Sequence, residues 1–600
     1  MQPSDPPPVF ADPQRRTKLE AAFPAVDAYL QSTVARDELV GLAAGIVIDG
    51  ELAWFRGYGL RDPARNLPVE RDSVFGVGSI TKTFTALAVL RLRDEGRVHL
   101  DRPAEDYLPA LGAIAYPTAD SPRITIRHIL THTSGLPRMG DFPEYPATPP
   151  SRDEFLATLT GLGLDRPPGE RRVYSNLAFQ LLGPLIGEVT GVDHREYVSD
   201  TILVPLGMTS TAWTPEDVPG DRLAVGHERA PGQPPRARPH WRPGAADAAG
   251  GLYSSVEDLA RYAAFNLAAW PARDEPEAGP LRRSTLREAQ SLAVLTSFAA
   301  TSMRDGPARA SVSGSGLGFG VQVNCQIDHI VAHAGKTLNY RAALHMLPSR
   351  GVAVILLSNL SSIPSTALPN DGQKILEILE ASGGLEPRRH TPSTPLLAAA
   401  GELAGLVSRW DDEVHARLFS ADHRDAYPKP QVEANLADWR AQVGACREPR
   451  PVKIEDPRAG TFEFACERGT LRVELRVAPW AAGTITSFTI HEATGLTAAP
   501  ALVRAGQRFF RLLDRWSARE FAALFADNFT AASMRSAFAE AAAQFGRCTL
   551  GGAKISRPHE AVFALACERG APTLRLKLAP AEPAKIVEFH LREAHDGPCR

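Results

Sequence analysis

The sequence has little that would place the chain in a membrane or on a nucleic acid. No apolar run approaches the roughly 18 residues that a helix needs to cross a bilayer. A net charge of −3 gives no reason to expect a nucleic acid or an anionic membrane as a partner. The first residues also lack the basic start and the apolar stretch of a signal peptide. We expect a disordered leader over residues 1–20, and one explanation is that it remains where a signal was cut off and replaced by a start methionine.

The patterns of two common hydrolase sites are also missing. There is no G-x-S-x-G nucleophile elbow, because Ser134-Gly135 and Ser315-Gly316 lie in plain loop contexts. His128 and His132 are four residues apart, but no glutamate follows His128 and no third ligand is suggested. We therefore expect no metal site and no other cofactor.

The chain is long enough for several domains, and strand patterns indicate a sheet near its start. Its 600 residues, with 44% hydrophobic and 22% charged residues, are ordinary for a soluble multidomain protein. Two apolar runs, residues 44–48 and 52–55, flank Asp49-Gly50, a dipeptide favoured in tight primed turns. Further strands near residues 319–323 and 353–357 are expected in the same antiparallel sheet, with helices packed against it.

The tetrad Ser79-Ile80-Thr81-Lys82 carries the strongest chemical signal. It follows a strand-like run and opens a helical run that ends near Gly96. Residues three apart are neighbours on a helix, so the serine hydroxyl and the lysine amine are expected to lie side by side. A serine hydroxyl needs a neighbouring base before it acts as a nucleophile, and a partly desolvated lysine can serve as that base. Ser79 would also lie at a helix N-terminus, where free N–H groups favour negative charge.

Four further segments follow the tetrad in the first 360 residues. They are residues 124–137, which include His-Thr-Ser-Gly-Leu-Pro, Tyr174-Ser175-Asn176, residues 249–259, and His333-Ala334-Gly335. In this order and spacing the five segments resemble the serine beta-lactamase and penicillin-recognising family. The resemblance is to its class C-like branch, with D,D-peptidase, D-aminopeptidase and esterase relatives. It implies an α/β (α+β) beta-lactamase/transpeptidase-like fold over residues 21–385, with an antiparallel sheet flanked by helices.

The resemblance also implies roles for individual residues. Ser79 is expected to be the acylated nucleophile, and Lys82 the group that lowers the cost of its deprotonation. Tyr174 is expected to be the second proton-handling group, and which of Lys82 and Tyr174 starts the reaction stays open. Asn176 is expected to orient Lys82 and to hydrogen-bond a substrate amide or ester. The backbone N–H groups of Ser79 and Lys336 are expected to form the oxyanion hole.

His333 departs from the pattern of many relatives, which carry a Lys-Thr-Gly triplet at this place. A permanent cation there helps to bind a substrate carboxylate, whereas a histidine is only fractionally charged near neutral pH. This departure weighs against beta-lactamase activity, although a histidine is familiar among the peptidase and esterase members. Lys336, just after Gly335, would restore a positive charge if its side chain reaches the site. His333, Gly335 and Lys336 are thus expected to bind the substrate.

Other polar residues of these segments have structural interpretations. His132 invites a Ser-His pairing, but in this family its segment is usually a structural turn. Ser254 or Ser255 is the expected N-cap of a helix that starts at Val256. The proline-rich residues 142–150 and 231–243 are expected to be surface loops, at places where relatives build the walls of the cleft.

Beyond residue 390 the sequence contains a duplicated unit. Arg409-Trp410 recurs as Arg515-Trp516, and the run Ala-Cys-Glu-Arg-Gly at residue 465 recurs at residue 566. Each unit predicts helices followed by three or four alternating strands, a small α+β sandwich. The form resembles a pair of NTF2-like cone domains over residues 395–497 and 500–600. No functional residue follows from this resemblance, and we expect structural or substrate-shaping appendages.

Cysteine spacing indicates the compartment. Four of the six cysteines fall two to a repeat at matching places, which predicts the disulfides Cys446–Cys466 and Cys548–Cys567. Cys325 and Cys599 are then expected to be free. Paired cysteines favour an oxidising compartment, hence a periplasmic or secreted protein. The alternative is a cytoplasmic protein with six reduced thiols.

Three functions are compatible with these residues. The first is a serine hydrolase that acts through an acyl-enzyme on a D-amino-acid peptide, amide or ester, with a small molecule or peptide as its partner. The second is a class C-like beta-lactamase, against which His333 argues. The third is a non-catalytic protein that binds peptidoglycan or another ligand on the same fold. The intact set of Ser79, Lys82, Tyr174 and Asn176 argues against it, because a binding module does not need all four.

Overall fold

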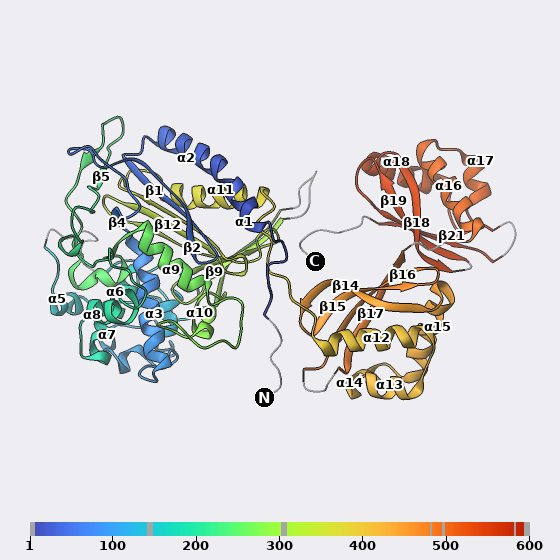
Figure 1. The fold of residues 1–600 in the computed structure, drawn as a ribbon, viewed down its shortest axis with the longest axis horizontal. Coiled ribbons are helices and arrows are strands. Elements are labelled where there is room, and N and C mark those ends of the chain that lie inside the picture. Colours follow the sequence, from blue (N-terminus) through green and yellow to red (C-terminus); the bar gives the residue numbers. More distant parts are fainter. Residues whose placement is uncertain are drawn as a thin grey trace. The chain divides into compact units, whose positions relative to one another are not determined.

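The computed structural model describes two compact units. The described residues are 7–140, 148–301, 309–479, 483–494, 498–557, 559–580 and 584–592. Of the described residues, one unit comprises 10–388, and the other comprises 7–9 and those from Arg389 to Arg592 (Figure 1). Within these residues no helix combines the length and the apolar character needed to span a membrane.

A nine-stranded sheet forms the centre of the first unit. Its order is β3-β2-β1-β13-β12-β11-β10-β9-β8, and every neighbouring pair is antiparallel. The predicted hairpin is confirmed, since Asp49 and Gly50 both take positive φ values, 52° and 88°, between the first two strands. The strands are β1 Gly41–Ile48, β2 Glu51–Asp62, β3 Leu67–Pro68, β8 Val294–Thr301, β9 Arg309–Ser315, β10 Gly320–Asn324, β11 Ile330–Lys336, β12 Arg341–Leu347 and β13 Val352–Ser358.

Helices cover both faces of this sheet, as Figure 1 shows. Side chains of β1 alternate between two cores: Leu42 and Ala44 pack toward one face, and Ala43 and Val47 toward the other. The first face is covered by α1 Arg15–Ala21, α2 Phe23–Asp37 and α11 Ala367–Ala381. The second face carries the larger core and most of the remaining helices, among them α3 Thr81–Asp94, α6 Asn176–Gln180, α7 Leu182–Thr190, α8 His194–Val198, α9 Val256–Leu267 and α10 Arg283–Ala289.

The expectation of a disordered leader over residues 1–20 is wrong for residues 15–20, which are helical. Residues 1–6 lie outside the described part of the chain, but Val9 pairs with Arg389 and α1 begins at Arg15. Arg15 is 4% exposed, and its Nη1 atom donates to Asp49 at 2.6 Å. Leu19 is fully buried in the core under α2. The ion pair and the apolar contact, neither of which shows in local composition, order this segment.

The second unit contains two repeats, each with helices packed on a four-stranded antiparallel sheet. Alternate residues of β16 are buried, which is the period-two pattern that the sequence predicted. The first repeat consists of α12 Thr394–Ser408, α13 Asp412–Leu418, α14 Ala421–Ala426, α15 Lys429–Val443, β14 Cys446–Asp456, β15 Ala459–Cys466, β16 Gly469–Val477 and β17 Ile485–Thr494. The second consists of α16 Pro500–Asp514, α17 Ala518–Leu524, α18 Ala531–Phe545, β18 Cys548–Arg557, β19 Glu560–Cys567, β20 Thr573–Leu578 and β21 Ile586–Arg592. The resemblance to NTF2-like domains stays a prediction.

Each repeat is crosslinked between its first two strands. Cys446 is bonded to Cys466 and Cys548 to Cys567, at directly opposed positions of the two sheets. The expectation that Cys325 is a free thiol is wrong, because it is disulfide-bonded as well. Cys325 has no copy in the repeats, so the repeat pattern carries no information on its pairing. Cys599 lies outside the described residues.

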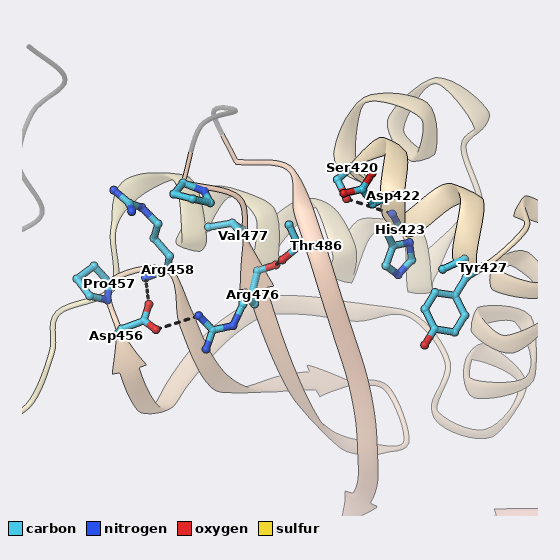
Figure 2. Close-up of a pocket in the computed structure, with 12 residues that line it drawn as sticks. Ser420, Asp422, His423, Tyr427, Asp456, Pro457, Arg458, Arg476, Val477 and Thr486 are labelled. Atoms are coloured by element: carbon cyan, nitrogen blue, oxygen red, sulfur yellow. Dashed lines mark hydrogen bonds and ion pairs between the residues drawn. The ribbon is translucent and has the colours of Figure 1, made fainter. Parts of the chain in front are cut away.

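The first repeat also contains a cavity of about 620 Å³. It lies between α14 and one end of the sheet (Figure 2). At this end β14 turns into β15, β16 ends and β17 begins. Its lining mixes aromatic, apolar and charged side chains, and the cavity is wholly within the second unit.

Candidate active site

The Ser79 tetrad lies where a short strand meets a buried helix, as predicted. Strand β4 (Val74–Gly76) leads into a 3₁₀ turn, Gly78–Ile80, and α3 starts at Thr81. The Nζ atom of Lys82 lies 3.1 Å from the Oγ atom of Ser79, within hydrogen-bond distance. The nucleophile and its candidate base are therefore already in contact.

The amine of Lys82 is completely buried and held from the opposite side. Nζ also donates to the carbonyl of Ala249 at 2.6 Å, and Lys82 is 0% exposed. One turn further along α3, the hydroxyl of Thr85 donates to the carbonyl of Ala248 at 2.7 Å. These bonds fix the 3₁₀ turn Gly244–Ala249 against α3. The Lys82 side chain is thus shielded from bulk water, whereas Ser79 is partly exposed.

A buried ionic cluster orders that turn. Asp247 is 1% exposed and accepts a hydrogen bond from Nε2 of His194 at 2.6 Å. It also forms an ion pair with Arg195. Arg195 also donates to the carbonyl of Gly244 at 2.9 Å. The cluster therefore ties α8 to the turn that holds Lys82. The sequence analysis missed these residues, because a lone Asp in an alanine-rich run carries no motif.

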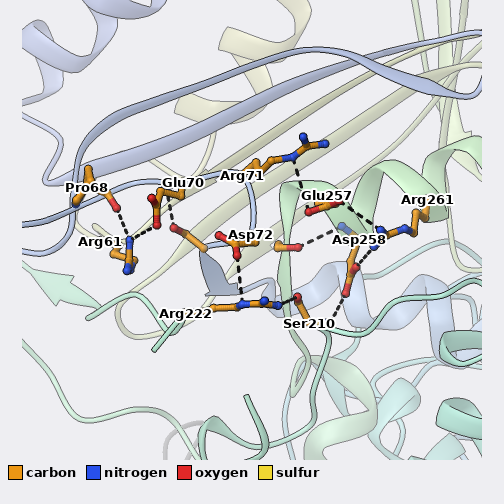
Figure 3. Close-up of polar contacts among 12 residues, drawn as sticks. Arg61, Pro68, Glu70, Arg71, Asp72, Ser210, Arg222, Glu257, Asp258 and Arg261 are labelled. Atoms are coloured by element: carbon orange, nitrogen blue, oxygen red, sulfur yellow. Dashed lines mark hydrogen bonds and ion pairs between the residues drawn. The ribbon is translucent and has the colours of Figure 1, made fainter. Parts of the chain in front are cut away.

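A second polar network anchors the strand that precedes Ser79. Strand β4 pairs with β7 (Tyr253–Ser255), and Figure 3 shows the contacts around this pair. Arg222 bridges Asp72 and the hydroxyl of Ser210, while the carboxylate of Asp258 accepts the N–H of Ser210 at 2.7 Å. Ser255 caps α9 by accepting the N–H of Asp258, which confirms one of the two predicted caps. Residues far apart in the sequence thus hold β4 in place.

Tyr174 and Asn176 lie at the start of α6, beside the tetrad. The Tyr174 ring centroid is 5.1 Å from Nζ of Lys82, so the two candidate proton-handling groups are adjacent. Ser175 caps the helix by accepting the N–H of Ala178 at 3.0 Å, which leaves Asn176 as the first helical residue. The amide Nδ2 of Asn176 lies 3.4 Å from the sulfur of Met139. Its role in orienting Lys82 stays a prediction.

Strand β11 passes close to the backbone of the tetrad. A Cβ atom on Gly335 would lie 1.9 Å from the carbonyl oxygen of Val77, and one on Gly78 would lie 2.7 Å from the backbone nitrogen of Lys336. Gly78 also has a φ of 51°, which other residues rarely adopt. The two glycines therefore allow the chain before Ser79 to approach β11. This proximity is what an oxyanion hole formed by the N–H groups of Ser79 and Lys336 requires.

His333 is neutral in this environment. Burial, with a further contribution from the positive charge of Lys82, lowers the pKa of His333 to about 4. Its Nδ1 atom lies 2.9 Å from the carbonyl oxygen of Ala334, and a neutral ring donates its proton there. The side chain therefore offers Nε2 as an acceptor and brings no positive charge near neutral pH.

The side chain of Lys336 does not compensate for this neutrality. Successive side chains of a strand point to opposite faces, and β11 pairs with β12 without a break from Val331 to Lys336. Val331 packs in the core under α3, whereas Ile330 packs in the core under α2 and α11. His333 shares the face of Val331, and Lys336 shares the face of Ile330. The Lys336 side chain lines a separate cavity of about 530 Å³, together with Arg341.

The described residues contain no group of three or more His, Cys, Asp or Glu side chains that could hold a metal ion.

Comparison with known proteins assigns the chain to a family. The model of the beta-lactamase family matches residues 26–376, which is more than half of the chain. The chain belongs to the serine beta-lactamase and penicillin-binding-protein family.

Relatives of this family member are found among bacteria and a slime mould. The chain is 34% identical over 249 residues to the D-alanyl-D-alanine-carboxypeptidase/endopeptidase AmpH of Escherichia coli K12. That alignment covers 41% of this chain and 62% of AmpH. The chain is 31% identical over 288 residues to beta-lactamase-like protein 2 of Dictyostelium discoideum, which is 46% of this chain and 50% of that protein. The chain thus spans less than two thirds of these relatives.

A solved structure supports the fold. The octameric penicillin-binding protein homologue from Pyrococcus abyssi aligns with a TM-score of 0.52 at 17% identity. The alignment covers 94% of this chain and 100% of that one. At this level of identity the likeness concerns the fold alone.

Two arginines near Tyr174 are further residues of the family member's site that the sequence analysis missed. The guanidinium carbons of Arg138 and Arg172 lie 5.5 Å and 6.0 Å from the Tyr174 ring centroid. Arg172 is held by a hydrogen bond from its Nε atom to the hydroxyl of Ser315 at 2.6 Å. Two guanidinium groups thus lie beside the phenol ring of Tyr174. Arg172 belongs to the run Arg171-Arg172 and Arg138 follows Pro137, but nothing in the sequence distinguished either from an arginine of a solvated loop.

Proposed function

We propose that the protein is a serine hydrolase that acts through an acyl-enzyme on a D-amino-acid peptide, amide or ester. The observation that carries the proposal is the contact of Ser79 with Lys82 and the position of Tyr174. Nζ of Lys82 lies 3.1 Å from the serine Oγ atom and 5.1 Å from the phenol ring centroid. A nucleophile, a base and a second proton carrier are thus assembled before any substrate binds.

The residues suit a two-step reaction. The Ser79 proton passes to the Lys82–Tyr174 pair as Oγ forms a bond to the substrate carbonyl carbon. Negative charge that develops on the carbonyl oxygen is stabilised by the N–H groups of Ser79 and Lys336, a contribution of about 3 kcal/mol per donor in such sites. The leaving amine or alcohol takes the proton when its bond to carbon breaks. Water then attacks the acyl-Ser79 ester by the reverse proton route and releases the acid.

The substrate class rests on His333 and on the relatives. A neutral His333 offers weak recognition of the carboxylate of a beta-lactam, which favours D-peptide, amide or ester hydrolysis over beta-lactamase activity. The name of AmpH describes a D-alanyl-D-alanine carboxypeptidase and endopeptidase, the same substrate class. A small molecule or peptide is therefore the proposed partner, with no nucleic acid.

An oxidising compartment is part of the proposal. The disulfides Cys446–Cys466 and Cys548–Cys567 support a periplasmic or secreted location, since cytosolic reductants keep most such thiols reduced.

Mass spectrometry of the intact protein tests the activity. The protein is incubated with chromogenic esters, D-alanyl peptides and beta-lactams, and with a fluorophosphonate probe. We expect a covalent adduct on the peptide that contains Ser79, and turnover of an ester or D-alanyl peptide above that of any cephalosporin. Labelling that survives Ser79→Ala would contradict the proposed nucleophile, and faster turnover of a cephalosporin would contradict the proposed substrate class.

A further inference from the structure

The two C-terminal repeats share a row of aromatic contacts but differ in its chemistry. In the second repeat the row is built from Trp516 and three phenylalanines, with neighbouring ring centroids 5.3, 4.8 and 5.2 Å apart: Trp516, Phe521, Phe525 and Phe529. In the first repeat the spacings are similar, 5.0, 5.2, 4.6 and 5.1 Å, but two members are histidines and a tyrosine is added: Trp410, His415, Phe419, His423 and Tyr427.

His423 and Phe529 occupy equivalent places. The ring of His423 lies 5.7 Å from that of Phe488 on β17, and the ring of Phe529 lies 5.8 Å from that of Phe589 on β21. The preceding aromatic residue of each row also pairs with the same strand. Phe419 forms a β-bridge with Ile485, the first residue of β17, and Phe525 forms one with Ile586, the first residue of β21. A phenylalanine therefore satisfies the packing at this place, so packing does not explain the histidine.

The histidine costs stability. His423 is 4% exposed, and its Nδ1 atom has no hydrogen-bond partner among the described residues. His415 is 3% exposed, and its Nε2 atom also has no hydrogen-bond partner among the described residues. Burial lowers the pKa of both rings, so both are neutral near pH 7. An unsatisfied buried polar atom destabilises the fold, and the second repeat avoids this destabilisation. The second repeat has phenylalanines in both places, so the two buried imidazoles are a chemical difference between the copies that packing does not require.

The end of this row forms one side of the cavity in the first repeat. His423 and Tyr427 line it, and Tyr427 is 51% exposed, so its ring offers a free face. Arg458 and Arg476 line the opposite side (Figure 2). Asp456 accepts the N–H of Arg458 at 2.8 Å and the Nη1 of Arg476 at 3.0 Å, which positions the second guanidinium. Apolar atoms of the cavity come from residues such as Val477.

The sequence of the second repeat differs at the same positions. With the conserved Ala-Cys-Glu-Arg-Gly runs superposed, Asp456 corresponds to Arg557 and Arg476 to Lys577. The acid that orients the guanidinium is therefore absent from the second repeat. Both copies keep an apolar core, although its residues differ in identity, and both keep the disulfide. The ion pair of Asp456 with Arg476 is therefore particular to the first repeat.

We infer that the first C-terminal repeat binds a small organic carboxylate with a flat apolar body. The carboxylate is bound by Arg458 and Arg476, because planar guanidinium groups match carboxylate geometry. The flat body lies on the ring of Tyr427, and a polar group of the ligand bonds to the imidazole of His423. Asp422 also lines the cavity, which disfavours a polyanion such as a polyphosphate. A volume of about 620 Å³ is within the range of small-molecule sites.

This binding site is separate from Ser79 and does not depend on the proposed hydrolase activity. Phenylacetate and its neutral isostere phenylacetamide serve as probes, with isothermal titration of the full chain. We expect phenylacetate to bind at least about tenfold more tightly, because a charge-assisted bond to a guanidinium contributes more than a neutral one.

Variants locate the binding. His423→Phe introduces the residue of the second repeat, so we expect the melting temperature to be kept or raised while phenylacetate binding weakens by about tenfold or more. Arg476→Gln, at a half-exposed position, is expected to weaken it similarly without unfolding the repeat. His491→Gln, on the same sheet but outside the cavity, is the control and should leave binding unchanged. Equal affinity for the two probes, or phenylacetate binding that persists in both His423→Phe and Arg476→Gln, would overturn the inference.

Discussion

The imidazole ring of His132 lies against the phenol ring of Tyr174, with the ring centroids 4.3 Å apart. His132 also accepts backbone N–H groups on both sides of Tyr174: its carbonyl accepts that of Val173 at 2.8 Å, and its Nδ1 atom accepts that of Ser175 at 3.2 Å. Burial, with Lys82 next in effect, lowers the pKa of His132 well below its usual value, so the ring is a neutral acceptor. His132 is therefore a positioning residue for Tyr174, and not a partner of the serine.

The first prediction concerns this positioning. His132 has a φ of 60°, which asparagine tolerates, so His132→Asn removes the ring without backbone strain. We expect kcat to fall by about 10²-fold with little change in KM, because Tyr174 loses the surface that fixes its ring. Steady-state kinetics on a chromogenic ester measure both constants. His128→Asn in the same segment is the control, and a kcat within twofold of the unmodified protein for His132→Asn would refute the role.

The second prediction concerns the base. Lys82→Ala should lower kcat by about 10²–10⁴-fold, the usual contribution of a positioned proton-transfer group. The fold should persist, although loss of the bond to the Ala249 carbonyl leaves a buried acceptor unpaired at a cost of about 1–3 kcal/mol. Circular dichroism and a thermal melt separate the two effects. Lys374→Ala, at an exposed position on α11, is the matched control, and an equal loss of activity there would remove the support for Lys82.

The sequence predicts contacts between residues that are close along the chain, and it does not predict contacts between distant segments. The contact of Ser79 with Lys82 follows from helical spacing alone, and the fold follows from five ordered segments. The burial of Lys82 does not, because the carbonyl that holds it is 167 residues away and belongs to a turn ordered by Asp247. His132 and Tyr174 are adjacent only because two loops fold together. Side-chain direction decided the outcome for Lys336, which strand alternation places on the face opposite His333.

The third prediction follows from that direction. His333→Lys places a permanent charge on the active-site face, so we expect kcat/KM for a cephalosporin to rise about tenfold or more relative to a neutral p-nitrophenyl ester. Lys336→Met changes the opposite face and keeps its backbone N–H, so this ratio should not change. A loss of activity toward carboxylate-bearing substrates in Lys336→Met would show instead that Lys336 reaches the cleft.

The ionisation of His333 gives a related test with a defined sign. Its pKa of about 4 lies below the ordinary value of 6.5, so the ring gains a proton only as the pH falls toward 4. Between pH 6 and pH 8 the His333 ring therefore stays almost wholly neutral. The pH profile of kcat/KM in that range should therefore be unchanged in shape by His333→Gln, and a shift of its acidic limb would contradict a neutral His333.

The fourth prediction concerns the approach of β11 to the tetrad. A Cβ atom at Gly335 would lie 1.9 Å from the carbonyl oxygen of Val77, far inside contact distance, so Gly335→Ala must push the two backbones apart. We expect a fall in kcat of about 10²–10³-fold, the cost of a lost oxyanion donor. Gly401→Ala on α12 is the control, because a Cβ atom there would meet nothing within 4 Å. Gly161 is equally open, but its φ of 78° would strain an alanine. Full activity of Gly335→Ala would exclude the proposed oxyanion hole.

The last prediction concerns the crosslinks of the second unit. Non-reducing peptide mapping of protein from its native host should recover the Cys446–Cys466 and Cys548–Cys567 pairs, and no free thiol at Cys325. The two loops are closed by residues 20 and 19 apart, so loss of either crosslink should cost about 3 kcal/mol of repeat stability. The paired change Cys446→Ser with Cys466→Ser should lower the melting temperature of the second unit and leave Ser79 labelling intact, because the nucleophile belongs to the other unit. Four or more free thiols in native protein would contradict both the pairing and the proposed export.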